Sequence, residues 1–127
     1  MQETVLENIC PAAEAERAAE RLERVVQLLG IDRTRLSEKL DGCASGFSGG
    51  ELQRISIARA LMKDSDVYLF DEPFSNIEEK KKTELFRGIC SFLADKTVIF
   101  ISHDGEICDE AARIGVQSRL FDDMIHS

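Results

Sequence analysis

Two adjacent carboxylates and one histidine are the residues of this chain best suited to chemistry. Asp71 and Glu72 follow an apolar run at residues 66–70, and His103 follows a second apolar run at 96–101. If both runs are parallel strands, these side chains leave the carboxyl end of a sheet, where open α/β sheets bind ligands. Neighbouring residues on an extended chain point to opposite sides, which suits the two acids to different tasks. The alternative is that both acids are solvated residues that close a strand and that the histidine is inert.

A second candidate lies at the start of an expected helix. Ser48 and Glu51 stand at capping-box spacing, with Gly49 and Gly50 between them. Glycines leave the backbone N–H groups of the first turn uncovered, so a phosphate can approach the positive end of the helix dipole closely. A well-made helix start with no ligand would explain the same four residues.

The apolar pattern predicts the elements that would position these groups. The runs at 66–70 and 96–101 are almost unbroken, as in parallel strands covered on both faces. A helix over 78–94 joins them into one βαβ unit, expected to be right-handed. The buried stripe of this helix is expected to comprise Leu85, Phe86, Ile89 and Leu93. Its solvent face is expected to carry the lysine run Lys80, Lys81 and Lys82.

Further helices are predicted on both sides of this unit. Leu22, Val25, Val26 and Leu29 recur at helical steps in a segment over 12–29 that Gly30 can end. The remaining expectations are a short helix and a loop over 31–45, a helix over 48–63, a helix over 105–112, a third strand over 113–117 and a tail over 118–127.

In order and spacing, these motifs closely resemble the C-terminal half of an exporter-like ABC transporter ATP-binding domain. Residues 46–54 are similar to the ABC signature, with Phe47 where the family usually has leucine; residues 67–72 resemble the Walker B strand and catalytic glutamate, and His103 resembles the switch histidine. The resemblance implies an α/β, partial P-loop NTPase (ABC ATPase) fold, with parallel strands, flanking helices and part of the helical signature subdomain. Residues 1–127 would form a single incomplete domain, in which 1–62 are the helical subdomain and 63–127 run from Walker B to the switch histidine.

The same resemblance implies roles for individual residues. Asp71 would hold Mg²⁺ through water, Glu72 would polarise the attacking water as general base, and His103 would sense the γ-phosphate of ATP. Contact with the γ-phosphate of ATP held by a second ABC ATPase subunit would come from Ser48, Gly49, Gly50 and Gln53. The D-loop would comprise Ser75 and Glu78, and Glu78 replaces the usual aspartate, which puts communication between two sites in doubt.

The chain contains no glycine-rich stretch ending in Gly-Lys-Ser/Thr, the loop that cradles the β- and γ-phosphates. By resemblance it begins just past the glutamine loop. Phosphoryl transfer depends on positioning and charge stabilisation, so the chain alone is expected neither to hold nor to hydrolyse ATP efficiently. We expect a Walker-A-bearing N-terminal half to complete the domain, because without it a sheet face and apolar strand edges would be uncovered.

Partners and location follow from the resemblance. Residues 4–9 are similar to the segment that faces the membrane domain's coupling helix in exporters, although a turn of amphipathic helix would look the same. A transporter role implies a transmembrane domain as partner and a peripheral place on the cytoplasmic side of the membrane. The alternatives are a degenerate, non-catalytic ABC subunit that donates its signature in trans, and a soluble DNA-repair or SMC-like ABC ATPase fragment.

Size and composition narrow these choices. The chain has 127 residues, enough for one modest domain, and its net charge of −8 argues against nucleic acid as a partner. The four cysteines are scattered without metal-ligand spacing, as expected for reduced thiols in a cytosolic protein, and no apolar run is long enough to cross a bilayer.

Overall fold

The computed structural model describes residues 3–10, 17–40 and 46–113. Contacts divide the chain into two compact units, Met1–Asp66 and Val67–Ser127. Each unit is described by itself.

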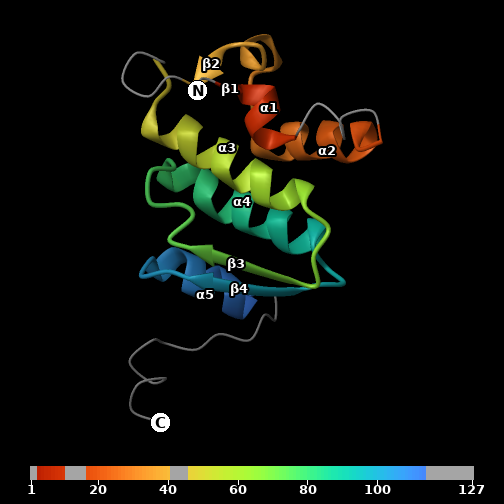
Figure 1. The fold of residues 1–127 in the computed structure, drawn as a ribbon. Coiled ribbons are helices and arrows are strands. Elements are labelled where there is room, and N and C mark those ends of the chain that lie inside the picture. Colours follow the sequence, from red (N-terminus) through yellow and green to blue (C-terminus); the bar gives the residue numbers. More distant parts are fainter. Residues whose placement is uncertain (1–2, 11–16, 41–45, 114–127) are drawn as a thin grey trace. The chain divides into compact units, whose positions relative to one another are not determined.

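The first unit is built around the helix α3 (Gly49–Met62), against which α1 (Val5–Ile9) and α2 (Ala19–Leu29) pack, as Figure 1 shows. A 3₁₀ turn, η2 (Arg33–Arg35), follows α2, and the unit also contains a pair of two-residue strands. These strands, β1 (Glu3–Thr4) and β2 (Lys39–Leu40), pair antiparallel. The buried apolar side chains of α1 and α2 are Val5, Ile9, Val25, Val26 and Leu29.

Two helix boundaries in this unit agree with the sequence. Gly30 ends α2 with a left-handed backbone (φ 63°), and its N–H donates to Gln27 O at 3.2 Å. Only glycine adopts this conformation at little cost, which is why it commonly ends helices. The helix predicted over 48–63 is confirmed as α3, with Ser48 as its N-cap and Lys63 as its C-cap. The pairing of β1 with β2 was not predicted, and residues 11–16 and 41–45 lie outside the described part.

The second unit is a βαβ unit followed by one helix. Strands β3 (Val67–Asp71) and β4 (Thr97–Ile101) pair parallel, with Val67 opposite Thr97 and Asp71 opposite Ile101. The helix α4 (Glu79–Phe92) connects them, and α5 (Gly105–Arg113) follows β4 (Figure 1). In this unit, the predicted strands and helices are confirmed to within two residues. In the first unit, by contrast, the helix predicted over 12–29 begins only at Ala19, because Arg17 and Ala18 form a turn. The third strand expected over 113–117 falls, apart from Arg113 at the end of α5, outside the described residues, as does the tail.

An aromatic cluster joins α4 to one face of this sheet. The Phe100 ring stacks on Phe70 with 5.2 Å between centroids and meets the edge of Phe86 from α4 at 4.9 Å. Phe74 stacks on Phe100 at 6.2 Å, and Tyr68 lies on the same face of β3 as Phe70, 4% exposed. These rings form the core that holds the carboxyl ends of both strands in place.

The opposite face of the sheet carries exposed aliphatic side chains, which no described helix covers. Val67 and Leu69 are 56% and 63% exposed, and Ile99 and Ile101 are 48% and 38% exposed. The prediction that these strands are covered on both faces is therefore wrong for this chain, whereas the expectation of an uncovered sheet face is met. The physical reason is that α4 packs on the aromatic side, and no described helix covers the aliphatic side chains that alternate with the rings.

One expectation for α4 is also wrong. Lys80 and Lys81 face solvent, but Lys82 is only 8% exposed. Lys82 lies one helical turn before Phe86, on the face that α4 buries, so its position follows the apolar stripe and not the charge run. The predicted stripe of Leu85, Phe86, Ile89 and Leu93 is fully buried.

Candidate active site

Asp71 and Glu72 stand where β3 ends, and the chain turns sharply there. Asp71 is exposed and is the last paired residue of the strand, opposite Ile101. The N–H of Glu72 donates to Ile101 O at 2.7 Å, and Glu72 has a φ of 47°, a left-handed value that residues with a side chain rarely adopt. The strained backbone therefore redirects the Glu72 side chain away from the alternation that the strand would impose.

Glu72 lies against His103, which follows β4. The backbone N–H of His103 donates to Glu72 Oε1 at 3.0 Å, and His103 Nε2 lies 3.7 Å from the same oxygen. The imidazole is 84% exposed and the carboxylate 37% exposed, so a ligand from solvent can reach both. The structure thus brings Glu72 and His103 together at one open edge of the sheet. A carboxylate there can accept a hydrogen bond from a water molecule or from the imidazole.

The turn that carries His103 is held by its neighbours. Asp104 N–H donates to Ser102 Oγ at 3.0 Å, and Asp104 Oδ1 accepts the Glu106 N–H at 2.9 Å at the start of α5. Asp104 Oδ2 lies 2.7 Å from Nζ of Lys82. This hydrogen bond lowers the pKa of Asp104, and the same bond raises the pKa of Lys82.

Sequence reasoning missed both partners of this ion pair, although a signal was present. Positions 82, 85, 86, 89 and 93 are separated mostly by three or four residues, the spacing that places side chains on one face of a helix. Lys82 therefore shares the face that the apolar residues of this series bury. A lysine in such a series needs a carboxylate partner. Asp104 also stands directly before Gly105 and Glu106, as a residue that caps a helix does.

The residues expected to form the D-loop lie between Glu72 and the body of α4. Ser75 is exposed, between buried Phe74 and the turn that ends at Ile77. Glu78 is exposed and flanks the start of α4 without a side-chain capping bond. Both residues are therefore accessible to solvent.

In the other unit, Ser48 and Glu51 form a complete capping box. Glu51 N–H donates to Ser48 Oγ at 3.1 Å, and Ser48 N–H donates to Glu51 Oε1 at 3.0 Å. Among the residues that the structure describes, none accepts a hydrogen bond from the amides of Gly49 or Gly50. Gly49 is exposed and Gln53, one turn further along, is half-buried. Within the described part of the chain, the first turn of this helix therefore has amide donors without an acceptor.

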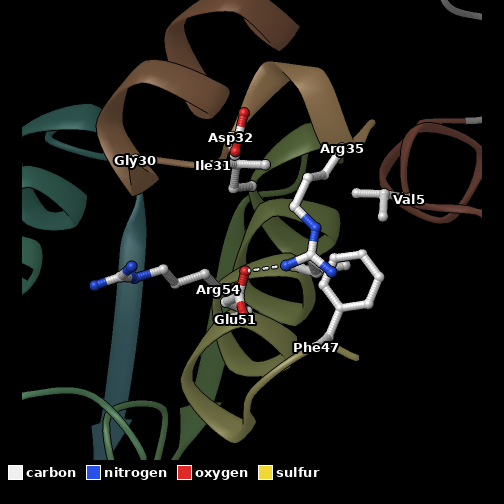
Figure 2. Close-up of a pocket in the computed structure, with 9 residues that line it drawn as sticks. Val5, Gly30, Ile31, Asp32, Arg35, Phe47, Glu51 and Arg54 are labelled. Atoms are coloured by element: carbon white, nitrogen blue, oxygen red, sulfur yellow. Dashed lines mark hydrogen bonds and ion pairs between the residues drawn. The ribbon is translucent and has the colours of Figure 1, made fainter. Parts of the chain in front are cut away.

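Arg35 braces the same helix start from η2. Its Nη1 lies 2.7 Å from Glu51 Oε2, and its guanidinium stacks over the Phe47 ring at 3.8 Å (Figure 2). The pKa of Glu51 is lowered, first by the hydrogen bond from the Ser48 backbone and further by Arg35. Glu51 is thus an ionised acid that keeps the cap in place.

A pocket opens beside Arg35, within the first unit. It has a cavity volume of about 70 Å³, and Figure 2 shows Arg35, Glu51 and Phe47 at its rim; its lining comprises Val5, Gly30, Ile31, Asp32, Arg35, Phe47, Glu51, Arg54 and Ile55. Ligand pockets commonly measure about 300–1,000 Å³. This pocket is too small for a nucleotide.

The described residues include no group of three His, Cys, Asp or Glu side chains placed to hold a metal ion. One carboxylate nevertheless fits Mg²⁺, which usually keeps several waters and takes its other ligands from substrate phosphates. Asp71, exposed at the end of β3, meets that requirement. In the same described part of the chain, no helix is long and apolar enough to span a membrane.

A parallel βαβ unit with acids at its carboxyl edge, joined in sequence to a glycine-opened helix, defines part of an α/β ATPase domain of the P-loop class. The model of the family described as "ABC transporter" matches residues 1–75. The chain belongs to this family.

Individual relatives agree with that assignment. ABC transporter C family member 5 of Arabidopsis thaliana is 38% identical over 104 residues, which cover 76% of this chain and 7% of the relative. The macrolide export ATP-binding/permease protein MacB of Nitrosomonas europaea is 38% identical over 96 residues, covering 75% of this chain and 14% of the relative. The chain therefore spans only a small part of the length of the curated relatives it matches.

Solved structures show the same fold. An archaeal ribosome recycling factor, aABCE1, in complex with the ribosomal stalk protein aP1, has a TM-score of 0.67 at 29% identity over 86% of this chain and 20% of its own. A bacterial Atm1-family ABC exporter with ATP bound has a TM-score of 0.64 at 23% identity over 88% of this chain and 20% of its own.

Proposed function

We propose that the chain is the C-terminal part of an ATP-hydrolysing domain of an ABC transporter, which couples ATP hydrolysis to transport. The observation that carries the proposal is the contact of Glu72 with His103 at the carboxyl edge of a parallel strand pair. Membership of the ABC transporter family supports the choice of ATP as the substrate.

In this proposal, the two acids divide the chemistry. Glu72 Oε1, already 3.0 Å from the His103 amide, orients the attacking water and takes its proton. His103, which is exposed beside Glu72, donates a hydrogen bond to the γ-phosphate and so acts as the sensor of that phosphate. Asp71 would hold Mg²⁺ through water, and the ion, when bound, would supply positive charge to the phosphates.

The helix start of α3 acts on a second nucleotide. The amides of Gly49 and Gly50, with Ser48 and Gln53, contact the γ-phosphate of an ATP held by a second ABC ATPase subunit. Support comes from amides that have no acceptor among the described residues, at a helix N-terminus where the dipole favours an anion. Ser75 and Glu78 would complete the contact between the subunits.

A half that carries the Gly-Lys-Ser/Thr loop is the partner proposed for the uncovered sheet face. The face presents four aliphatic side chains, each more than one third exposed: Val67, Leu69, Ile99 and Ile101. A contiguous apolar patch of this kind is costly in water and favours association. A transmembrane domain would then hold the assembled ATPase, meaning this chain together with the loop-bearing half, at the cytoplasmic side of the membrane.

The test is the Glu72→Gln variant of the assembled ATPase. Removing the base should lower turnover by at least about a hundredfold, while nucleotide affinity stays within a few fold. Glu84→Gln, an exposed acid on α4, is the matched control and should leave both unchanged.

Undiminished turnover in Glu72→Gln would remove Glu72 from this role and favour a non-catalytic subunit that only donates its signature. The chain without the loop-bearing half should show no saturable ATP binding and should self-associate. A monodisperse monomer with micromolar affinity for ATP would contradict the proposed division of the site.

A further inference from the structure

Lys82 is a buried cation that the proposed chemistry does not use. It is 8% exposed, and its ammonium lies 2.7 Å from Asp104 Oδ2 and 3.0 Å from Glu79 Oε1. Asp104 is itself only 18% exposed at its side chain. A lysine is seldom buried unless a carboxylate pairs with it, and here the pairing joins α4 to the turn after β4.

The surroundings of Lys82 are acidic. Glu79 and Asp104 contact it directly, and Glu106 lies close enough to Glu79 that their mutual repulsion raises the pKa of Glu106. Lys82 thus pairs directly with two carboxylates, Glu79 and Asp104, and Glu106 adds a third negative charge beside Glu79. Without Lys82, Asp104 would be pushed toward solvent by its acidic neighbours.

Asp104 is one residue from His103, so a shift of Asp104 moves the contact with Glu72. The Asp104 backbone donates to Ser102 Oγ, its carboxylate accepts the Glu106 N–H, and the preceding amide, that of His103, donates to Glu72 Oε1. These bonds form a chain of covalent and hydrogen-bonded links from α4 through Asp104 and His103 to Glu72. All of them lie in the second unit.

We propose that Lys82 is a positioning residue, which holds Asp104 so that the His103 amide stays bonded to the Glu72 carboxylate in its reactive orientation. The inference rests on the proposed function of Glu72. A displacement of a reacting group by about 1 Å can cost a hundredfold in rate, which is why an ion pair remote from substrate can control turnover.

The first test measures geometry in the assembled ATPase, by amide hydrogen exchange of the peptide that contains His103. Lys82→Met keeps the length and removes the charge, and it should speed exchange there about tenfold, while exchange within β4 is unchanged. Lys82→Arg should restore protection, and Lys81→Met, an exposed neighbour, should have no effect. Unchanged exchange in Lys82→Met would overturn the proposal.

The second test measures turnover in the same samples. Lys82→Met should lower kcat about tenfold to a hundredfold with KM within about twofold, and Lys82→Arg should recover most of it. A structural role alone would reduce the amount of folded protein, not the kcat of what remains. If Lys82→Met does not fold, Asp104→Asn tests the same link, because the amide keeps the Glu106 contact and loses the charge.

The two hypotheses fail differently. If Glu72→Gln retains turnover, the proposed function is wrong. If Glu72→Gln loses turnover but Lys82→Met and Asp104→Asn behave like Lys81→Met, the function stands and Lys82 is a structural residue only.

Discussion

The helices α1 and α3 begin with the same device and continue differently. Thr4 and Glu7 exchange bonds of 3.1 and 3.0 Å, as Ser48 and Glu51 do. After the cap of α1, the amides of Val5 and Leu6 each donate to a carbonyl of the 36–38 segment at 2.9 Å, and Val5 is 1% exposed.

After the cap of α3, the corresponding residues are Gly49 and Gly50, and among the described residues nothing takes up their amides. A capping box therefore starts a helix but does not make a binding site. What distinguishes the two starts is whether the chain itself uses the donors of the first turn. In the proposed function, the five-residue α1 serves only the fold of its unit, whereas the fourteen-residue α3 offers its first turn to the ATP of a second subunit.

The largest expected effect comes from placing a negative charge at the α3 start. Gly49→Asp should lower turnover of the assembled ATPase by at least about a hundredfold, since it repels the phosphate from the amides. The same acid interacts favourably with the helix dipole, so the unfolding free energy of the chain should change by less than about 0.5 kcal/mol. Gly49→Asn, similar in shape and neutral, should lose less turnover. Equal losses of turnover in the two variants would show that the site excludes the size of a side chain at position 49 and not its negative charge.

A core substitution at the α1 start should have the opposite profile. Val5→Ala should lower the unfolding free energy by about 2 kcal/mol, because it removes buried methyl groups and leaves a cavity. Urea unfolding followed by circular dichroism measures this. Leu52→Ala on α3, at a side chain that is 42% exposed, is the control and should cost less than half as much. A smaller cost at Val5 than at Leu52 would contradict the contrast between the two starts.

Removing the N-cap side chain of α1 or of α3 tests the capping box that both helix starts share. Thr4→Ala and Ser48→Ala should each cost about 1 kcal/mol of stability. Only Ser48→Ala should also reduce turnover, since only that helix start is proposed to meet a phosphate. Loss of turnover in both variants, measured at equal amounts of folded protein, would mean that α1 takes part in the site.

The smallest effect concerns pH. The folded-state pKa of Glu51 is lowered, so its contribution to stability is present above its unfolded pKa of about 4.3 and is lost as pH falls through the folded value. Glu51→Gln should therefore flatten the pH dependence of the unfolding midpoint below about pH 4.3. Near neutral pH, the slope of the midpoint against pH should be the same in the variant and the parent protein. An unchanged slope in acid would show that the carboxylate gains nothing from Ser48 and Arg35.

The sequence predicted the elements that carry strong periodic patterns. The stripe of Leu85, Phe86 and Ile89 fixes α4 and its buried face, and the apolar runs fix β3 and β4. Gly30 marks the end of α2, since a left-handed residue is needed there. Local signals of this kind do not depend on distant parts of the chain.

What could not be predicted depends on contacts that are distant in sequence. The strands β1 and β2 are two residues each, too short to show alternation, and their partners stand more than thirty positions apart. The burial of Lys82 depends on Asp104, twenty-two residues later. The positive φ of Glu72 arises where its N–H still bonds to Ile101 O while the chain turns toward Pro73. Glutamate has no intrinsic preference for this conformation, so the sequence gives no signal for it.

The distribution of aromatic residues decides how this protein can be followed in solution. The chain has no tryptophan and a single tyrosine, Tyr68, which lies 4% exposed on the ring-bearing face of β3. The tyrosine emission therefore reports on the strand pair that carries Glu72, and the helical unit around α3 contributes no tyrosine or tryptophan emission. A Phe47→Trp substitution would give that unit its own chromophore, so that one sample could show in what order the two units melt.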